Sequence, residues 1–76
     1  MPHVIVKLYS GRSEQQKAAL AEALTKAVMR TLKQGADSVS VGIEDVEPKD
    51  WAAKVYKTDI LGKPGTIYKE PGYNPL

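Results

Sequence analysis

An alternating apolar pattern opens the chain. Residues 4–9 read VIVKLY, a run rich in β-branched and aromatic types whose side chains would point alternately to two sides. Three aliphatic side chains share one face of this segment, whereas Ile5 and Tyr9 lie on the other. The pattern predicts a β-strand from Val4 to Tyr9 that carries apolar residues on both faces.

A four-residue repeat follows and indicates a helix. Aliphatic residues recur at every fourth position, at Leu20, Leu24, Val28 and Leu32. This spacing forms one apolar stripe along a helix. Ser13 followed by Gln16 matches a capping box, in which each side chain satisfies a free backbone amide of the other residue. A helix is therefore predicted from Glu14 to Lys33, with Gly35 as the residue that ends it.

A second alternating segment completes a strand, helix and strand unit. Val39, Val41 and Ile43 alternate with small or polar residues, which predicts a strand from Ser38 to Val46. Two strands joined by one helix normally lie parallel, with a right-handed crossover. The expected fold class is therefore α/β (α+β), a βαβ unit with two parallel strands and one long helix.

The pattern after the second strand is shorter. Pro48 stands where a helix can begin, and Lys49 to Tyr56 is predicted as a short helix. Trp51, Val55 and Tyr56 would be its inward-facing side chains. The βαβ unit is thus expected to carry a second, shorter helix.

Residues 61–66 are rich in residue types that favour turns. Pro64 and Gly65 suit the two central positions of a type II turn. Ile60 and Ile67 are therefore expected to flank a small hairpin. An ordered or semi-ordered tail follows it.

The length of the chain limits the size of its core. Its 76 residues are expected to form one domain, residues 1–76, which buries a small share of its surface. The chain has no cysteine, so neither a disulfide nor a thiolate metal site can stabilise it. One sheet face would be covered by the helix, while the face with Ile5 and Tyr9 would meet water. Self-association is therefore predicted from the pattern alone.

The charge is weak and scattered. Eleven lysines and arginines stand against nine acids, for a net charge of +2 without a basic run. A nucleic-acid footprint would gather its positive charge on one face. No apolar stretch approaches the roughly 20 residues that span a bilayer, and the chain does not open like a signal peptide. We therefore expect a cytoplasmic protein with no nucleic-acid or membrane partner.

Pro2 is the first candidate for chemistry. Removal of Met1 would leave the Pro2 nitrogen as a secondary amine, with an ordinary pKa of about 8 that an apolar pocket or a nearby cation would lower. Such an amine is suited to general base catalysis. The alternative is an ordinary proline at the first position of a strand. His3, the only histidine, adjoins Pro2 but would point to the opposite face, so no direct catalytic role is expected for it.

Three pieces of the sequence together carry a family resemblance. Pro2 directly follows the initiator, SGRSEQQK at residues 10–17 opens the helix, and DSVSV at residues 37–41 opens the second strand. This arrangement resembles the 4-oxalocrotonate tautomerase family, without a gap from Pro2 to Trp51. The tail, with its Pro-Gly-Tyr sequence, resembles a bacterial branch of that family whose members are dimers rather than hexamers.

The resemblance implies an activity and roles for individual residues. It implies a keto-enol tautomerase that moves a proton within a small enol or dienol acid, with Pro2 as the base and no metal or organic cofactor. Arg12 matches the arginine that binds a substrate carboxylate, and Trp51 matches a large aromatic residue that walls the pocket. Without the resemblance, Arg12 would be interpreted as a solvated turn residue and Trp51 equally as part of the core.

One position departs from the family pattern. Ser40 stands where hexameric members carry a second arginine, contributed by a neighbouring subunit. Because serine supplies no charge, a monocarboxylate such as an arylpyruvate enol, or a weaker and broader activity, is expected. The implied partner is a small-molecule enol or 2-oxo acid, and the implied assembly is a homodimer, with a hexamer as second choice.

Two other functions stay open from the sequence. One is dehalogenation or hydration of small unsaturated acids, in which Pro2 would act as a general acid. That reaction also needs a carboxylate to activate water, and the spacing selects none. The other is a non-catalytic oligomeric binding module, which retention of Met1 would favour because the Pro2 nitrogen would then be an amide.

Overall fold

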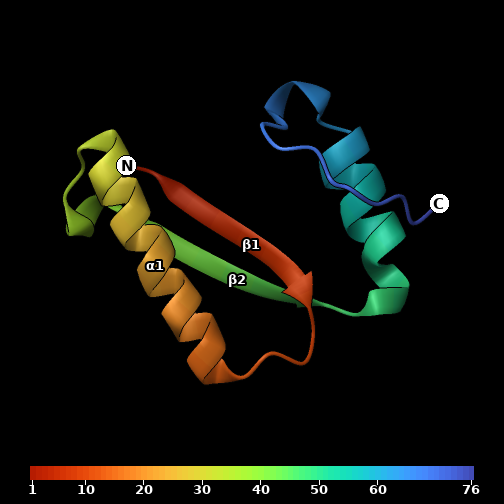
Figure 1. Cartoon of the computed structure of the whole chain (residues 1–76), viewed down its shortest axis with the longest axis horizontal. Coiled ribbons are helices and arrows are strands. Elements are labelled where there is room, and N and C mark those ends of the chain that lie inside the picture. The colour runs from red at the N-terminus through yellow and green to blue at the C-terminus, as the bar shows by residue number, and fades with distance from the viewer.

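Two parallel strands joined by a long helix form the first two-thirds of the chain. The computed structural model describes residues 1–76 (Figure 1). Its elements are β1 (His3–Tyr9), α1 (Glu14–Leu32), η1 (Ala36–Ser38), β2 (Ser40–Val46), η2 (Pro48–Asp50), η3 (Ala52–Leu61) and η4 (Pro64–Thr66). Strands β1 and β2 pair in parallel, with His3 opposite Ser40 and Tyr9 opposite Val46. The predicted βαβ unit with a second helix is therefore confirmed.

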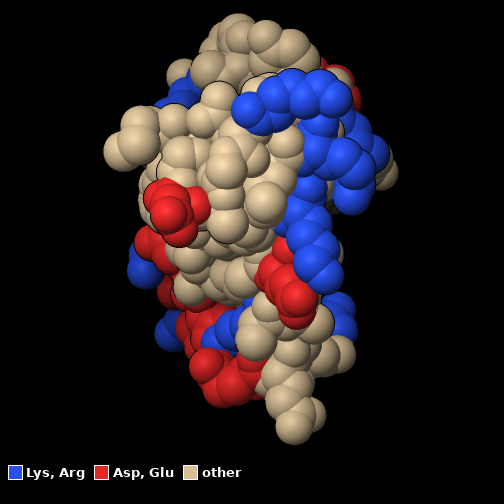
Figure 2. Space-filling model, turned by 90° about the vertical axis from the view of Figure 1, so that its left-hand side faces the viewer, with Lys and Arg blue, Asp and Glu red and all other residues tan.

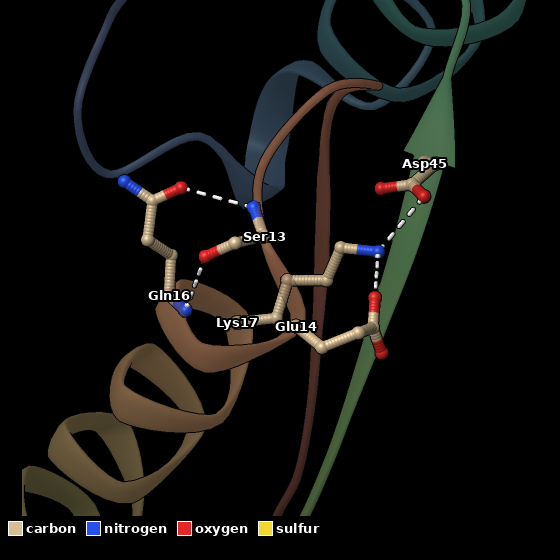
Figure 3. A network of polar contacts seen from close by, with 5 residues as sticks. All are labelled: Ser13, Glu14, Gln16, Lys17 and Asp45. Atoms are coloured by element: carbon tan, nitrogen blue, oxygen red, sulfur yellow. Dashed lines mark hydrogen bonds and ion pairs between the residues drawn. The ribbon is translucent and has the colours of Figure 1, made fainter.

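The start of α1 is held by the predicted capping box. The Gln16 amide donates to Ser13 Oγ at 3.1 Å, and the Ser13 amide donates to Gln16 Oε1 at 3.0 Å (Figure 3). One turn further, the Lys17 ammonium lies 2.9 Å from carboxylate oxygens of both Glu14 and Asp45. Because Asp45 belongs to β2, this contact ties the start of the helix to the far end of the sheet.

The end of α1 differs from the prediction. Lys33, and not Gly35, adopts the left-handed conformation, with φ of 58° against −79° for Gly35. A non-glycine residue in this region costs roughly 1 kcal/mol or more. Hydrogen bonds from the Lys33 and Gln34 amides to the Met29 carbonyl offset that cost. The helix therefore stops as soon as its apolar repeat ends.

The second strand also begins later than predicted. Residues 36–38 form η1, a 3₁₀ turn, and β2 starts at Ser40 rather than at Ser38. The Ser38 hydroxyl donates to the Gly35 carbonyl at 2.9 Å, which keeps Ser38 in the turn.

The second helix is longer than predicted, and it is a π-helix, which has a wider turn than an α-helix. Instead of running from Lys49 to Tyr56, the segment forms a 3₁₀ turn, η2, and then η3, a π-helix of ten residues. Val55 and Tyr56 are buried as expected, while Trp51, which precedes η3, is partly exposed. Lys7 of β1 contacts Asp59 of η3 at 2.5 Å, so this helix lies on the sheet face that α1 leaves open.

The predicted hairpin is absent, and this prediction was wrong. The sheet has two strands only, and Ile60 belongs to η3. Pro64–Thr66 forms a 3₁₀ turn, closed by hydrogen bonds from the Thr66 amide and hydroxyl to the Lys63 carbonyl at 3.0 and 2.7 Å. The ion pair of Asp59 with Lys7 favours the helical path, because it holds the second half of η3 against β1.

Charged side chains on α1 follow the helix dipole. Glu14 lies in its first turn and Arg30 in its last, which places each charge near the helix end of opposite sign. On the face shown in Figure 2, basic side chains gather along the upper right, while acidic and basic side chains are mixed in the lower half. None of the helices is both long enough and apolar enough to cross a membrane.

The molecule is flat and open, with almost no core of its own. Its extents are 40 × 31 × 18 Å, and its radius of gyration is 13.9 Å, against about 11 Å for a compact domain of this length. Only Val55 and Tyr56 are buried, while Ile5 is 57% and Tyr9 52% exposed. The sheet face that carries Ile5 is thus incompletely covered by the chain itself.

Candidate active site

Pro2 lies directly before β1 and is held by the neighbouring strand. Its carbonyl accepts a hydrogen bond from the Ser40 amide at 3.2 Å. Proline suits this position because a residue at the head of a strand need not donate an amide hydrogen bond. Pro2 is partly buried, whereas Met1 is 99% exposed and packs against nothing. Loss of Met1 would therefore leave the packing of the strand unchanged.

A polar pair stands beside Pro2. His3 Nδ1 and Ser40 Oγ are joined by a hydrogen bond of 2.6 Å. The two residues are paired across the parallel strands, and the His3 ring reaches toward Gly42, where a Cβ atom would lie 4.0 Å from it. The sequence does not single out this pair. Only the register of the two strands brings it together.

Arg12 lies in the turn between β1 and α1. It follows Gly11, whose φ of +117° is readily adopted only by glycine. The turn borders a cavity of about 200 Å³ lined by Leu8, Arg12, Gln16, Lys17 and Leu20. Lys17 is engaged by two carboxylates, and its hydrogen bond to Asp45 is the main reason that its pKa is raised. Arg12 is exposed and forms none of the ion pairs, so its guanidinium is available to an anion.

Trp51 stands just beyond β2 and is held from two sides. Its ring meets Tyr9 edge to face, with centroids 5.1 Å apart and planes at 81°. Its indole N–H donates to the Tyr73 hydroxyl at 2.9 Å. These three aromatic residues line a cavity of about 180 Å³. Trp51 is therefore a cavity wall and a packing residue at once.

A larger hollow next to Trp51 contains an ion pair. It measures about 430 Å³ and is lined by Ile5, Lys7, Trp51, Val55, Asp59, Ile60, Lys63 and Ile67. The hydrogen bond from Lys7 lowers the pKa of Asp59, and the same contact raises the pKa of Lys7. No three histidine or carboxylate side chains come together as a metal-binding group.

One chain does not bring the four predicted site residues together. Pro2 and Ser40 lie at the amino ends of the strands, while Arg12 and Trp51 follow the carboxyl ends of β1 and β2. A strand of seven residues spans roughly 20 Å, and no cavity is lined by any two of the four. Tyr73 joins the site instead, a residue that the spacing of the sequence does not distinguish.

With this geometry established, comparison with known proteins identifies the family. Residues 2–59 match the family described as "Tautomerase enzyme". The chain belongs to the tautomerase family. The probable tautomerase of Xylella fastidiosa is 42% identical over 76 residues, which is all of this chain and 93% of that protein. Tautomerase PptA of Cronobacter sakazakii is 36% identical over 74 residues, 96% of this chain and 97% of that protein.

Solved structures share the fold. TomN, a 4-oxalocrotonate tautomerase homologue of the tomaymycin biosynthetic pathway, superposes with a TM-score of 0.64 at 44% identity. That match covers 66% of this chain and 77% of TomN. A 4-oxalocrotonate tautomerase isozyme of Methylibium petroleiphilum gives a TM-score of 0.64 at 36% identity, over 66% and 81% of the two chains. The family resemblance seen in the sequence is therefore confirmed, and the tautomerase family is one of enzymes.

Proposed function

We propose that this tautomerase-family chain interconverts the keto and enol forms of small carboxylic acids, with the Pro2 nitrogen as base after Met1 is removed. The observation that carries the proposal is the position of Pro2. It is anchored at the head of β1 by the Ser40 amide, while Met1 is fully exposed. A base fixed to a strand loses little freedom when it meets its substrate.

The reaction needs one group that both accepts and donates a proton. The neutral Pro2 amine would take the proton from the hydroxyl of the enol, and electrons would move through the conjugated system to form the carbonyl. The same nitrogen, now protonated, would return that proton to carbon. An α-amino group has an ordinary pKa of about 8, and burial would lower it, so much of a free Pro2 amine would be neutral at physiological pH.

A second copy of the chain would complete the site. Arg12 and Trp51 lie roughly a strand length from Pro2, and β1 has an unpaired outer edge. A copy with its strand direction reversed would carry its own Arg12 and Trp51 to the Pro2 end. The exposed Ile5 and the small core support such an assembly. We propose a homodimer, with a hexamer as the alternative.

The residues of the proposed two-chain site favour a substrate with one carboxylate. Arg12 would bind that carboxylate through its guanidinium group, which is planar and permanently charged. Ser40, bonded to His3, adds no second arginine at the Pro2 end. The aromatic cavity of Tyr9, Trp51 and Tyr73 would suit an aryl group, so the substrate class that we propose is an arylpyruvate enol or a similar small enol acid.

Two measurements test this function. Intact mass of the protein from its own cells should be short by one methionine, and the purified protein should convert the phenylpyruvate enol, followed by ultraviolet absorbance. Pro2→Ala keeps an amino-terminal amine but replaces the ring, and it should lose most of the rate. A retained methionine, or full turnover by Pro2→Ala, would contradict the proposal. Chloride release from a haloacrylate, without enol turnover, would favour dehalogenation instead.

A further inference from the structure

Tyr73 contacts the candidate site from the far end of the chain. Its hydroxyl accepts the indole hydrogen bond of Trp51 at 2.9 Å, across 22 residues of sequence. Its ring also packs on Tyr56, with centroids 5.7 Å apart and planes at 49°. Tyr56 is one of the two buried residues of the chain, so Tyr73 is anchored on the core. Tyr73 lies outside residues 2–59, which match the tautomerase family.

The contacts of Trp51 constrain its ring in complementary ways. The edge-to-face contact with Tyr9 limits the tilt of the indole, and the hydrogen bond to Tyr73 limits its rotation. Without the Tyr73 hydroxyl, the indole N–H would have to turn toward water to find another partner. The ring that lines the aromatic cavity would then be free to leave its present orientation.

The end of the chain is arranged to present Tyr73. Pro71 is partly buried, and the Leu76 amide donates to the Asn74 side chain at 2.9 Å, which closes a local turn after Tyr73. The segment crosses beside η3, as the blue end of the ribbon in Figure 1 shows. The tail therefore has an ordered path that ends at the site.

We propose that Tyr73 is a positioning residue, which sets the orientation of Trp51 and so shapes the substrate wall of the tautomerase site. This inference rests on the proposed function. Tyr73 acts through Trp51 and takes no part in the proton transfer. Its effect should therefore fall on substrate binding, and most strongly on substrates with an aryl group.

The test compares Tyr73→Phe with Tyr68→Phe. Both changes remove one hydroxyl, but Tyr68 is 98% exposed and forms no hydrogen bond through its side chain, so it is a matched control. Tyr73→Phe should raise KM for the phenylpyruvate enol roughly 3- to 10-fold, the effect of one net hydrogen bond, with kcat nearly unchanged. Tyr68→Phe should leave both constants as in the wild type.

Fluorescence gives a readout of the indole itself. Trp51 is the only tryptophan, so emission and acrylamide quenching report on this residue alone. Tyr73→Phe should shift the emission to longer wavelength and increase quenching, whereas Tyr68→Phe should change neither.

A double-mutant cycle separates positioning from general packing. Trp51→Phe removes the N–H donor, so adding Tyr73→Phe to it should raise KM no further. Additive effects, or a Tyr73→Phe enzyme that behaves like Tyr68→Phe, would overturn this inference alone. An inactive wild type, or an active Pro2→Ala, would overturn the proposed function and this inference with it.

Discussion

Two cations share the cavity at the start of α1, yet only one of them is available to a ligand. Lys17 is held by Glu14 and Asp45, each at 2.9 Å, and these contacts raise its pKa. Arg12 lines the same cavity without an ion pair. Lys17 is thus engaged within the chain, and Arg12 remains the cation that we propose for binding an anionic substrate.

Replacement of Arg12 should weaken binding more than chemistry. We expect Arg12→Ala to raise KM for an enol carboxylate about 10- to 100-fold, because a hydrogen bond to a charged group is lost, and to change kcat much less. Steady-state kinetics measure both constants. Arg30→Ala is the matched control, since Arg30 is exposed in the last turn of α1 and lines a separate cavity. Equal KM values for the two variants would exclude the role of Arg12.

At the scale of the elements, α1 depends on its first turn. The capping box satisfies two backbone amides that would otherwise lack partners, and Lys17 joins this turn to β2 (Figure 3). The turn that carries Arg12 is therefore fixed at the helix side by Ser13.

Removal of the Ser13 side chain should lower the stability of the fold. Ser13→Ala should lower the free energy of unfolding by about 1 kcal/mol, the usual effect of removing an N-cap side chain. Urea unfolding at one fixed protein concentration measures it, because association also contributes to stability. Thr31 is exposed in the same helix and forms no side-chain hydrogen bond, so Thr31→Ala should leave the free energy of unfolding unchanged. A similar loss in both variants would show that the cap is not the cause.

Helix η3 is joined to β1 by the ion pair of Lys7 and Asp59. The hydrogen bond from Lys7 lowers the pKa of Asp59 below its ordinary 3.8. A lowered carboxyl pKa contributes stability that is present above the ordinary value and lost as the pH falls through the folded value. The contact between η3 and β1 through Lys7 and Asp59 should therefore weaken at acid pH.

This pH dependence can be measured on one variant. The stability difference between the wild type and Asp59→Asn should be constant from roughly pH 5 to 8 and should shrink as the pH falls below about 4. Urea unfolding across that range gives the difference at each pH. Glu22→Gln, which breaks an exposed ion pair within α1, is the control and should show a smaller change. A stability difference that does not change with pH would show that ionised Asp59 does not stabilise the fold through Lys7.

At the scale of the whole molecule, the sheet face opposite α1 is only partly covered, by η3. Ile5 is 57% exposed in the middle of β1, and only two residues of the chain are buried. A free chain of this kind would have little hydrophobic stabilisation. In the proposed assembly, pairing along the edge of β1 would complete the site, and packing of another copy on the Ile5 face would bury this apolar surface.

A charge on this face should disrupt the assembly. Ile5→Lys should shift the protein toward a monomer of 8.3 kDa at concentrations where the wild type is a dimer or hexamer, measured by sedimentation velocity. Leu32→Lys introduces the same charge at a residue of similar exposure on α1, 55% against 57% for Ile5, and should leave the assembly intact. A wild type that sediments as a monomer would contradict the proposed assembly.

Local patterns in the sequence were sufficient for the βαβ unit. The alternation in β1, the four-residue repeat of α1 and the capping box at Ser13 each concern residues close in sequence. The structure confirms the strand, the helix and the cap, but Leu20 and Leu32, at the two ends of the repeat, are exposed. Pro2 is a site candidate from the chemistry of its amine together with the family resemblance, whereas Arg12, Ser40 and Trp51 are candidates from the resemblance. Their roles, and the extent of the domain, stay predictions.

Tertiary structure decided the features that depend on distant partners. The length of η3 and the absence of a hairpin follow from contacts such as Lys7 with Asp59, 52 residues apart. Tyr73 reaches Trp51 only because the tail folds back, and no local pattern marks such a contact. The separation of Pro2 from Arg12 likewise follows from a straight strand between them, and so from geometry rather than from residue type.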